Sequence, residues 1–312
     1  MSTLLKHATA KAAVSPGNAL PAVASRSSRW LALGLLVIAA GLTAVALVGP
    51  LVAALVDYRV TETLRNQTIG LDAVSLFVVA PLALLAAFLV VRGHVAGPVL
   101  ALAIGAYTAY MFVQYVLGPD YAHMRGNNER LFPLALLLFA AGWAVALTAW
   151  QAIDVERLPR SPRRDRLVGR VVLPVLALAV FGRYVPSLID WMSSSPADKN
   201  YLAGPSFSWA IALLDLGVFL PLTAAACVGL IRGACWGQKA LYAVAGWFGL
   251  VGLAVAAMAN AMYVKDDPVA SGANTVFMSV LGGLFLVLAV YLYRPLLAPR
   301  DAGVVERRRR SR

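Results

Sequence analysis

The sequence predicts an all-α protein, a polytopic bundle of eight transmembrane helices. Of its 312 residues, 60% are hydrophobic and only 13% are charged, whereas about 45–50% and 25% are usual in soluble domains. The hydrophobic residues also gather into long runs, and about 20 mainly apolar residues suffice to cross the ~30 Å core of a bilayer. These two observations argue against a water-soluble globular protein.

Eight such runs can be read along the chain. They are 30–56, 71–91, 95–117, 131–151, 171–191, 207–231, 236–262 and 274–293. Because the backbone inside a bilayer must satisfy its own hydrogen bonds, we expect each run to be a helix. The first run is far longer than the 7–15 apolar residues of a secretory signal peptide, so we interpret it as a retained anchor.

The two ends of the chain have a different composition. Residues 1–29 are rich in Ala, Ser and basic residues and are expected to form a disordered cytoplasmic tail. Residues 295–312 are predicted to be a basic cytoplasmic tail. The transmembrane domain is therefore expected to cover residues 30–294.

The distribution of charge predicts the orientation. The chain has 27 Lys and Arg against 15 Asp and Glu, a net charge of +12. With the N-terminus inside, 20 of the basic residues fall on the inner side and 6 on the outer side. Since cytoplasmic loops carry the excess of Lys and Arg, we expect both termini in the cytoplasm and the protein in the plasma (inner) membrane.

A weak internal repeat links the second and sixth spans. Leu71-Asp72, Pro81-Leu82 and Arg92-Gly93 recur as Leu214-Asp215, Pro221-Leu222 and Arg232-Gly233. Both copies run in the same direction, which predicts two parallel halves of four helices, 30–151 and 171–294. The Asp-to-Arg separations differ, at 20 and 17 residues, and chance recurrence at membrane edges is the alternative.

Ionisable residues within a span are costly and mark candidate functional sites. At 1.5 Å per residue, Arg183 lies ~10 Å below the outer surface and Asp215 ~9 Å below it on the next span. The matching depths predict an intramembrane ion pair. Tyr184 is expected beside the pair, and Asp190, seven residues after Arg183, on the same helical face.

Other polar residues gather at the same level. Tyr107, Tyr110 and Gln114 share one face of the third span, while Asn260 and Asp72 lie at the outer ends of the seventh and second spans. If these faces converge, they line a cavity open to the outside. Two simpler interpretations stand beside this one: the tyrosines are interfacial belt residues, and the charge pair only locks two helices together.

Motifs for enzymatic chemistry are not found. The three histidines lie in a tail and in loops, where they cannot supply paired haem ligands or a zinc-binding helix. The residues around Gly233 and Lys239 lack the spacing of a phosphate-binding loop, and no GxSxG turn occurs. The sequence therefore predicts neither an enzyme nor a bound metal or cofactor.

Arginines beside the inner ends of the spans should attract anionic lipid headgroups. They are Arg157, Arg160, Arg163, Arg164, Arg166 and the terminal Arg307, Arg308, Arg309 and Arg310. We expect no nucleic-acid partner, since no folded inner domain is predicted to present them.

Three functions follow in order of preference. The first is a small-solute or ion transporter with an outward-facing polar site, in which Arg183 and Asp215 bind or gate. The second is a non-transporting membrane receptor or assembly protein. The third and weakest is a membrane enzyme acting on a lipid-borne substrate.

Overall fold

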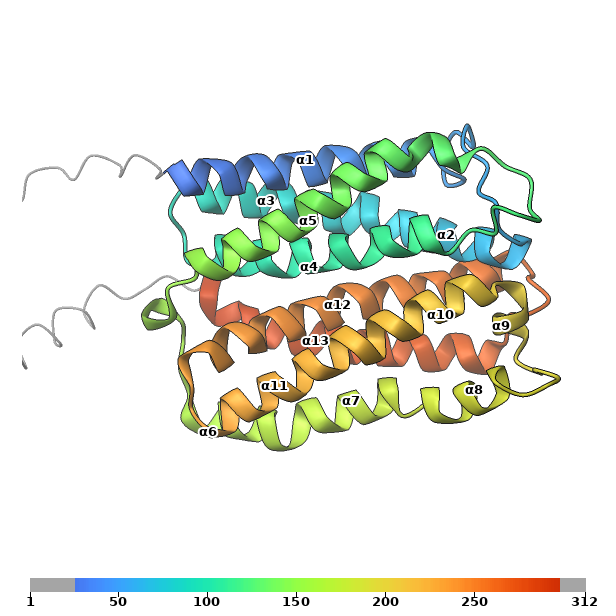
Figure 1. The fold of residues 1–312 in the computed structure, drawn as a ribbon. Helices are drawn as coiled ribbons and strands as arrows, with labels where there is room; N and C mark the ends of the chain where they lie inside the picture. Colours follow the sequence, from blue (N-terminus) through green and yellow to red (C-terminus); the bar gives the residue numbers. More distant parts are fainter. Residues whose placement is uncertain (1–25, 298–312) are drawn as a thin grey trace, which may run out of the picture.

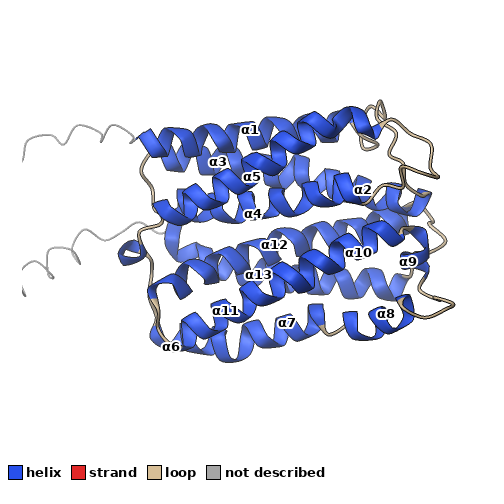
Figure 2. Ribbon diagram, viewed as in Figure 1, coloured by secondary structure: helices blue, strands red, loops and turns tan. Residues whose placement is uncertain are grey.

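The computed structural model describes residues 26–297, in which all regular secondary structure is helical (Figure 2). Eight helical units are long and apolar enough to cross a membrane, the number predicted. They are α1 (Arg26–Val48); α2, η1 and α3 (Glu62–Val74, Ser75–Val79, Ala80–Val91); α4 (Ala96–Leu117); η2 and α5 (Asn128–Leu131, Phe132–Ala152); α6, η4, α7 and α8 (Pro162–Leu167, Val168–Val172, Leu173–Phe181, Tyr184–Trp191); α10, η5 and α11 (Pro205–Leu214, Asp215–Phe219, Leu220–Ile231); α12 (Cys235–Val264); and α13 (Gly272–Leu297). Two short helices, η3 (Val155–Arg157) and α9 (Lys199–Ala203), lie in connections.

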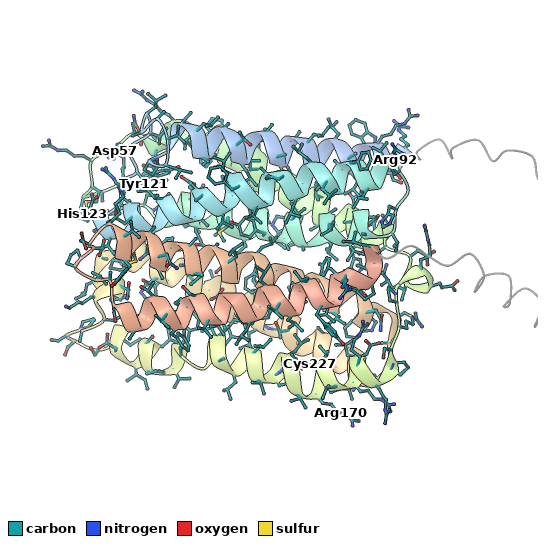
Figure 3. All side chains as sticks on the ribbon, turned by 180° about the vertical axis from the view of Figure 1, so that it is seen from behind. Asp57, Arg92, Tyr121, His123, Arg170 and Cys227 are labelled. Carbon is teal, nitrogen blue, oxygen red and sulfur yellow. The ribbon has the colours of Figure 1, made fainter. Side chains whose placement is uncertain are left out.

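The helical units lie side by side with the start of α1 and the end of α13 at the same end of the bundle (Figure 1). Arg92 and Arg170 lie toward this end, whereas Asp57, Tyr121 and His123 lie at the opposite end (Figure 3). We call these the basic end and the loop end of the bundle.

Several predicted boundaries were wrong. The first helix ends at Val48 and not at residue 56, because the residue before a proline, here Pro50, is disfavoured in the α conformation. The second begins earlier, at Glu62, where the Thr61 hydroxyl caps it by accepting a hydrogen bond from Leu64 N (3.5 Å). The fifth begins at Pro162 and is interrupted after Phe181.

The predicted tails were also too long. Residues 26–29 belong to α1 and residues 295–297 belong to α13. The remainder of the predicted disordered tail and of the basic C-terminal tail, including Arg307 to Arg310, lies outside the described residues.

In three units a π-helical turn ends two residues before a proline. Proline has no N–H, and its ring clashes with the carbonyl four residues earlier. Before Pro81, Pro174 and Pro221, the preceding residue donates its N–H to the carbonyl five residues back, as in the bond from Leu220 to Asp215. The wider turn carries the helix past the proline without ending it.

Two hairpin turns at the basic end share one geometry. Gly93 and Gly233 have φ values of 65° and 67°, which glycine adopts without steric cost. The N–H of each glycine donates to the carbonyl three residues back, at 3.0 and 3.2 Å, and the N–H of the next residue to the carbonyl five back, at 2.9 Å in both. This is the Schellman motif, which satisfies the last carbonyls of α3 and α11.

Glycines let neighbouring helices approach closely. A Cβ atom on Gly70 of α2 would lie 2.4 Å from the carbonyl carbon of Ala257 on α12. Added Cβ atoms on Gly105 and Gly282 would lie 2.7 and 2.5 Å from the carbonyl oxygens of Gly142 and Gly252. Small residues therefore bring α4 against α5, α12 against α13, and α2 against α12.

We expect Gly70→Ala to lower the thermal stability of the purified protein in detergent. The new methyl group would collide with the backbone of α12, and overpacking of this kind costs about 1–3 kcal/mol. Gly283→Ala on α13 is the matched control, because a Cβ atom there meets no atom within 4 Å. Equal unfolding temperatures for the two variants would contradict the close approach of α2 and α12.

Candidate functional site

A cavity of about 280 Å³ lies among α4, α8, α10, η5, α12 and α13. Five of the candidate residues line it, namely Arg183, Tyr184, Asp215, Tyr110 and Gln114. Four others, Asp72, Tyr107, Asp190 and Asn260, do not. More than half of the polar residues selected from the sequence therefore line the same cavity.

Asp215 is the central acid of the cavity. It is the first residue of η5, and its side chain is buried. One carboxylate oxygen, Oδ1, accepts a hydrogen bond from the Tyr110 hydroxyl (2.8 Å), and Oδ2 accepts one from the Tyr184 hydroxyl (2.7 Å). Both lengths are ordinary for hydrogen bonds from a hydroxyl to an oxygen. The carboxylate thus joins three helical units, through α4, α8 and η5.

The predicted ion pair between Arg183 and Asp215 is not formed, so this prediction was wrong. No salt bridge within 4.0 Å joins the two side chains. The Arg183 guanidinium instead lies 5.3 Å from the centroid of the Tyr184 ring, within the range of a cation–π contact. Tyr184 stands between the two charges in the interaction network, since its ring contacts Arg183 and its hydroxyl binds Asp215.

Arg183 lies at a break in the fifth unit. Pro186 cannot donate to the carbonyl of Gly182, four residues earlier, and Val185 N binds this carbonyl instead (3.3 Å). The chain therefore leaves the α-helix between α7 and α8. Arg183 is the N-cap residue of α8, and its side chain makes no capping hydrogen bond. It is exposed and also lines the cavity.

Two buried N–H donors in the cavity wall have no partner. They are the amide Nε2 of Gln114 and the indole Nε1 of Trp247, whose side chains are 5% and 2% exposed. Buried polar groups are nearly always hydrogen-bonded, and leaving one without a partner costs about 1–3 kcal/mol. Both residues line the cavity, but the two nitrogen atoms are covered by protein atoms, so each side chain must turn before its N–H can reach an acceptor in the cavity.

Apolar residues form most of the remaining wall, and many of them are aromatic or sulfur-containing. The Trp247 ring stacks on Phe219 with centroids 3.5 Å apart and meets Tyr110 edge-on at 5.2 Å. Phe248 stacks on Phe285 at 4.8 Å. The lining also includes Phe207, Phe277, Met111, Met258, Met262 and Met278. An apolar body is consequently favoured over a strongly hydrated ion as the occupant.

The cavity lies beside helices that are not in close contact. Elsewhere in the bundle α1 packs directly on α5, and added Cβ atoms on Gly34 and Gly41 would lie 2.6 and 2.5 Å from Val145 and Leu138. No contact of similar extent joins α7 or α8 to α13 within residues 26–297. Val180 of α7 and Leu281 of α13 both line the cavity that separates these helices, and α7 and α8 lie at the edge of the bundle (Figure 1).

Asp72 belongs to a second buried cluster, in the first half. Its Oδ1 accepts a hydrogen bond from the Tyr115 hydroxyl, while its Oδ2 and the buried Tyr58 hydroxyl have no partner. Burial, with the nearby Asp72 carboxylate, raises the pKa of the Tyr58 phenol in the loop before α2, so this phenol stays protonated. Tyr107 lies near this cluster, with its hydroxyl 3.2 Å from Ser75 Oγ.

The other two candidates have structural roles. Asp190 accepts hydrogen bonds from the backbone N–H groups of Ala197 and Asp198 (2.9–3.1 Å) and so shapes the loop after α8. Asn260 donates to Ser279 Oγ at 2.8 Å and links α12 to α13.

Sequence analysis missed Trp247 and did not predict the hydrogen bonds of Tyr115 and of the buried Asp267. Asp267 accepts hydrogen bonds from Thr63 (3.1 Å) and Asn66 (2.9 Å) and joins the loop after α12 to α2. A tryptophan inside an apolar run gives no signal that its N–H is unpaired. Tyr115 directly follows the predicted polar face, and the depth of Asp72 could have identified it.

Two of the arginines expected to contact lipid headgroups, Arg160 and Arg166, line a second cavity of about 400 Å³ together with Arg232. Arg164 forms a salt bridge with the buried Asp165 (3.0 Å), which also accepts a hydrogen bond from Gln238. Arg157 is 3.5 Å from the carbonyl of Gly93.

No group of three His, Cys, Asp or Glu side chains within residues 26–297 is arranged to hold a metal ion. No protein-family model matches the chain, and neither a curated protein nor a solved structure shows significant similarity to it.

We expect Tyr110→Phe and Tyr184→Phe each to destabilise the protein, because each removes a hydroxyl and leaves one oxygen of the buried Asp215 carboxylate without its partner. The cost should be about 1–3 kcal/mol, measured as a lower thermal unfolding temperature in detergent. Tyr291→Phe, at an exposed position on α13, is the control. Wild-type stability in both buried variants would argue against the bonds to Asp215.

Proposed function

We propose that the chain is an integral membrane protein of the plasma (inner) membrane that binds a small solute in the cavity beside Asp215 and transports it. The observation that carries this proposal is a cavity that has Arg183 and Asp215 in a largely apolar wall; Gln114 and Trp247, which also line it, each have a covered N–H without a partner. Arg183, Tyr184 and Asp215 are the proposed binding and gating residues, and the proposal involves no catalytic step, metal or cofactor.

The helices around the cavity are interrupted, which supports transport over static binding. The unit containing Arg183 breaks between α7 and α8, and the unit containing Asp215 has a π-helical turn at that residue. Transporter sites near the middle of the bilayer are commonly built from interrupted helices. Such interruptions let one part of a helix move without unfolding the rest.

A four-plus-four organisation is part of the proposal. The π-helical turns Ser75–Val79 and Asp215–Phe219 are separated by 140 residues, and so are the helices Ala80–Val91 and Leu220–Ile231 that follow them. The left-handed glycines Gly93 and Gly233 have the same separation. We infer two parallel halves from this constant spacing. In this alignment Asp215 corresponds to Ser75, whereas the sequence repeat paired it with Asp72.

We also propose that both termini are cytoplasmic. The basic end of the bundle carries Arg92 and Arg170 (Figure 3), as the excess of inner Lys and Arg requires. The arginines near the second cavity, with Arg307 to Arg310 of the tail, would then contact anionic lipid headgroups. A receptor or assembly protein that binds the solute without moving it is the alternative.

Flux through the reconstituted protein tests the transport proposal. We would use radiolabelled benzenesulfonate, an aromatic ring with a permanent negative charge, in proteoliposomes. Arg183→Ala removes the cation that faces the anionic probe and is expected to reduce protein-dependent uptake at least about tenfold, the effect of one lost charge-assisted hydrogen bond. Asp215→Asn disturbs the hydrogen bonds from Tyr110 and Tyr184 that shape the site and should also reduce uptake. Arg170→Ala, on the same helical unit but outside the cavity, should leave uptake unchanged.

Undiminished uptake in both cavity variants would refute this site. Saturable binding of benzenesulfonate to the wild type without any uptake would favour the receptor alternative.

The proposed orientation can be tested with the native cysteines. Cys235 is exposed and Cys227 is half-buried near the basic end. In intact cells a membrane-impermeant maleimide should leave Cys235 unlabelled and should label it after permeabilisation. His123→Cys, combined with Cys235→Ser, should be labelled from outside; the reverse pattern would place the termini outside.

A further inference from the structure

We propose that the cavity takes an amphiphile with an anionic head and an apolar tail, which reaches it sideways from the bilayer between α7–α8 and α13. This inference names the class of ligand for the transport site and therefore rests on the proposed function. Three features carry it: the chemistry of the unused polar groups, the apolar walls, and the separation of two helical units.

Beside Asp215, the polar atoms without a partner are donors. Both oxygens of Asp215 already accept tyrosine hydrogen bonds, so the carboxylate has its strongest sites occupied. Gln114 Nε2 and Trp247 Nε1 have no partner, and their side chains must turn to bring these N–H groups into the cavity that both residues line. A ligand that completes this set must present acceptor oxygens, as a carboxylate, sulfonate or phosphate does.

Arg183 favours a negative charge on those oxygens. Its guanidinium lines the cavity and contacts the Tyr184 ring, and no carboxylate lies within salt-bridge distance of it. A guanidinium at this depth in a membrane requires a counter-charge or polar partners. An anionic head supplies both a charge and a planar pair of acceptors that fits the guanidinium.

The walls favour an apolar tail on the same molecule. Phe248, Phe285 and Met278 line the cavity together with aliphatic residues of α12 and α13. The side chains of the flanking helices are also apolar and exposed, among them Leu178 on α7 and Val280 on α13. A tail lying between α7 and α13 would therefore contact apolar atoms from the cavity to the lipid.

The separation of α7–α8 from α13 provides the sideways path. The corresponding helices of the first half, α1 and α5, are in direct contact through Gly34 and Gly41. A water-soluble solute would instead arrive past Asp198, Asn200 and Asn274, the polar residues that also line this cavity. The two routes make different predictions for substitutions in the gap.

Equilibrium binding to the full chain in phosphatidylcholine nanodiscs tests this proposal, with empty nanodiscs as background. The probes are tritiated oleate, tritiated oleyl alcohol with the same chain but a neutral head, and radiolabelled benzenesulfonate. We expect oleate to bind at least about tenfold more tightly than oleyl alcohol, the effect of one charge-assisted interaction. Equal affinities for the two would overturn the anionic head.

Two variants test whether the anionic head of oleate binds beside Arg183 and Trp247. Arg183→Gln and Trp247→Phe should each weaken oleate binding several-fold, since Arg183→Gln removes the cation and Trp247→Phe keeps an aromatic ring but removes the N–H donor together with part of the indole. Arg170→Gln is the matched control for the loss of charge. Thermal unfolding of each variant in nanodiscs checks its fold. Unchanged oleate affinity in both folded cavity variants would overturn the assignment.

Leu281→Trp, which fills the gap from α13, tests the path. It should weaken oleate binding and leave benzenesulfonate binding intact, and an equal effect on both probes would overturn sideways access. Binding and uptake of benzenesulfonate without binding of oleate would overturn this inference alone, because the transport proposal would then stand with a water-soluble solute.

Discussion

The Asp215 carboxylate, held by the hydroxyls of Tyr110 and Tyr184, is the interaction on which the polar interior of the second half depends. A carboxylate placed in apolar surroundings without such partners would be strongly destabilising. The two bonds satisfy it and, at the same time, fix the positions of α4, α8 and η5. Since α4 is far from the other two in the sequence, this contact also connects distant segments of the chain.

The position of Arg183 follows from the same arrangement. Tyr184 uses its hydroxyl for Asp215 and its ring for Arg183, so the arginine stays near the acid without neutralising it directly. The guanidinium consequently remains accessible from the cavity. A direct ion pair would have consumed both charges and left little for a ligand to recognise.

Sequence reasoning predicted the helical class and the eight units, because hydrophobic run length determines them. It also selected Arg183 and Asp215, which line the same cavity. It also placed Tyr110 and Gln114 near Asp215, since a three-then-four spacing puts residues on one helical face. It did not separate Tyr107 and Asp72, which lie in the cluster around Ser75 and Tyr115. Which of the two clusters a residue of α4 joins depends on the orientation of α4 about its own axis, which the spacing of the residues does not determine.

Two further features could not be read from composition or spacing. The break at Arg183 depends on Pro186 within an otherwise apolar helix, and a proline there is also compatible with a gentle kink. The gap between α7–α8 and α13 depends on which helices touch, and helix periodicity does not contain that information. The unpaired indole of Trp247 likewise becomes visible only when every neighbour of the ring is known.

The π-helical turn at Asp215 has a mechanical consequence. Such a turn holds one residue more than an α-helical turn, and each residue of an α-helix accounts for about 100° of rotation. Tightening η5 to an α-turn would therefore rotate α11 relative to α10 by roughly that angle. Asp215, which binds the two tyrosines, is the first residue of this turn. A rotation of α11 about this turn would therefore be coupled to a rearrangement of the hydrogen bonds of Asp215.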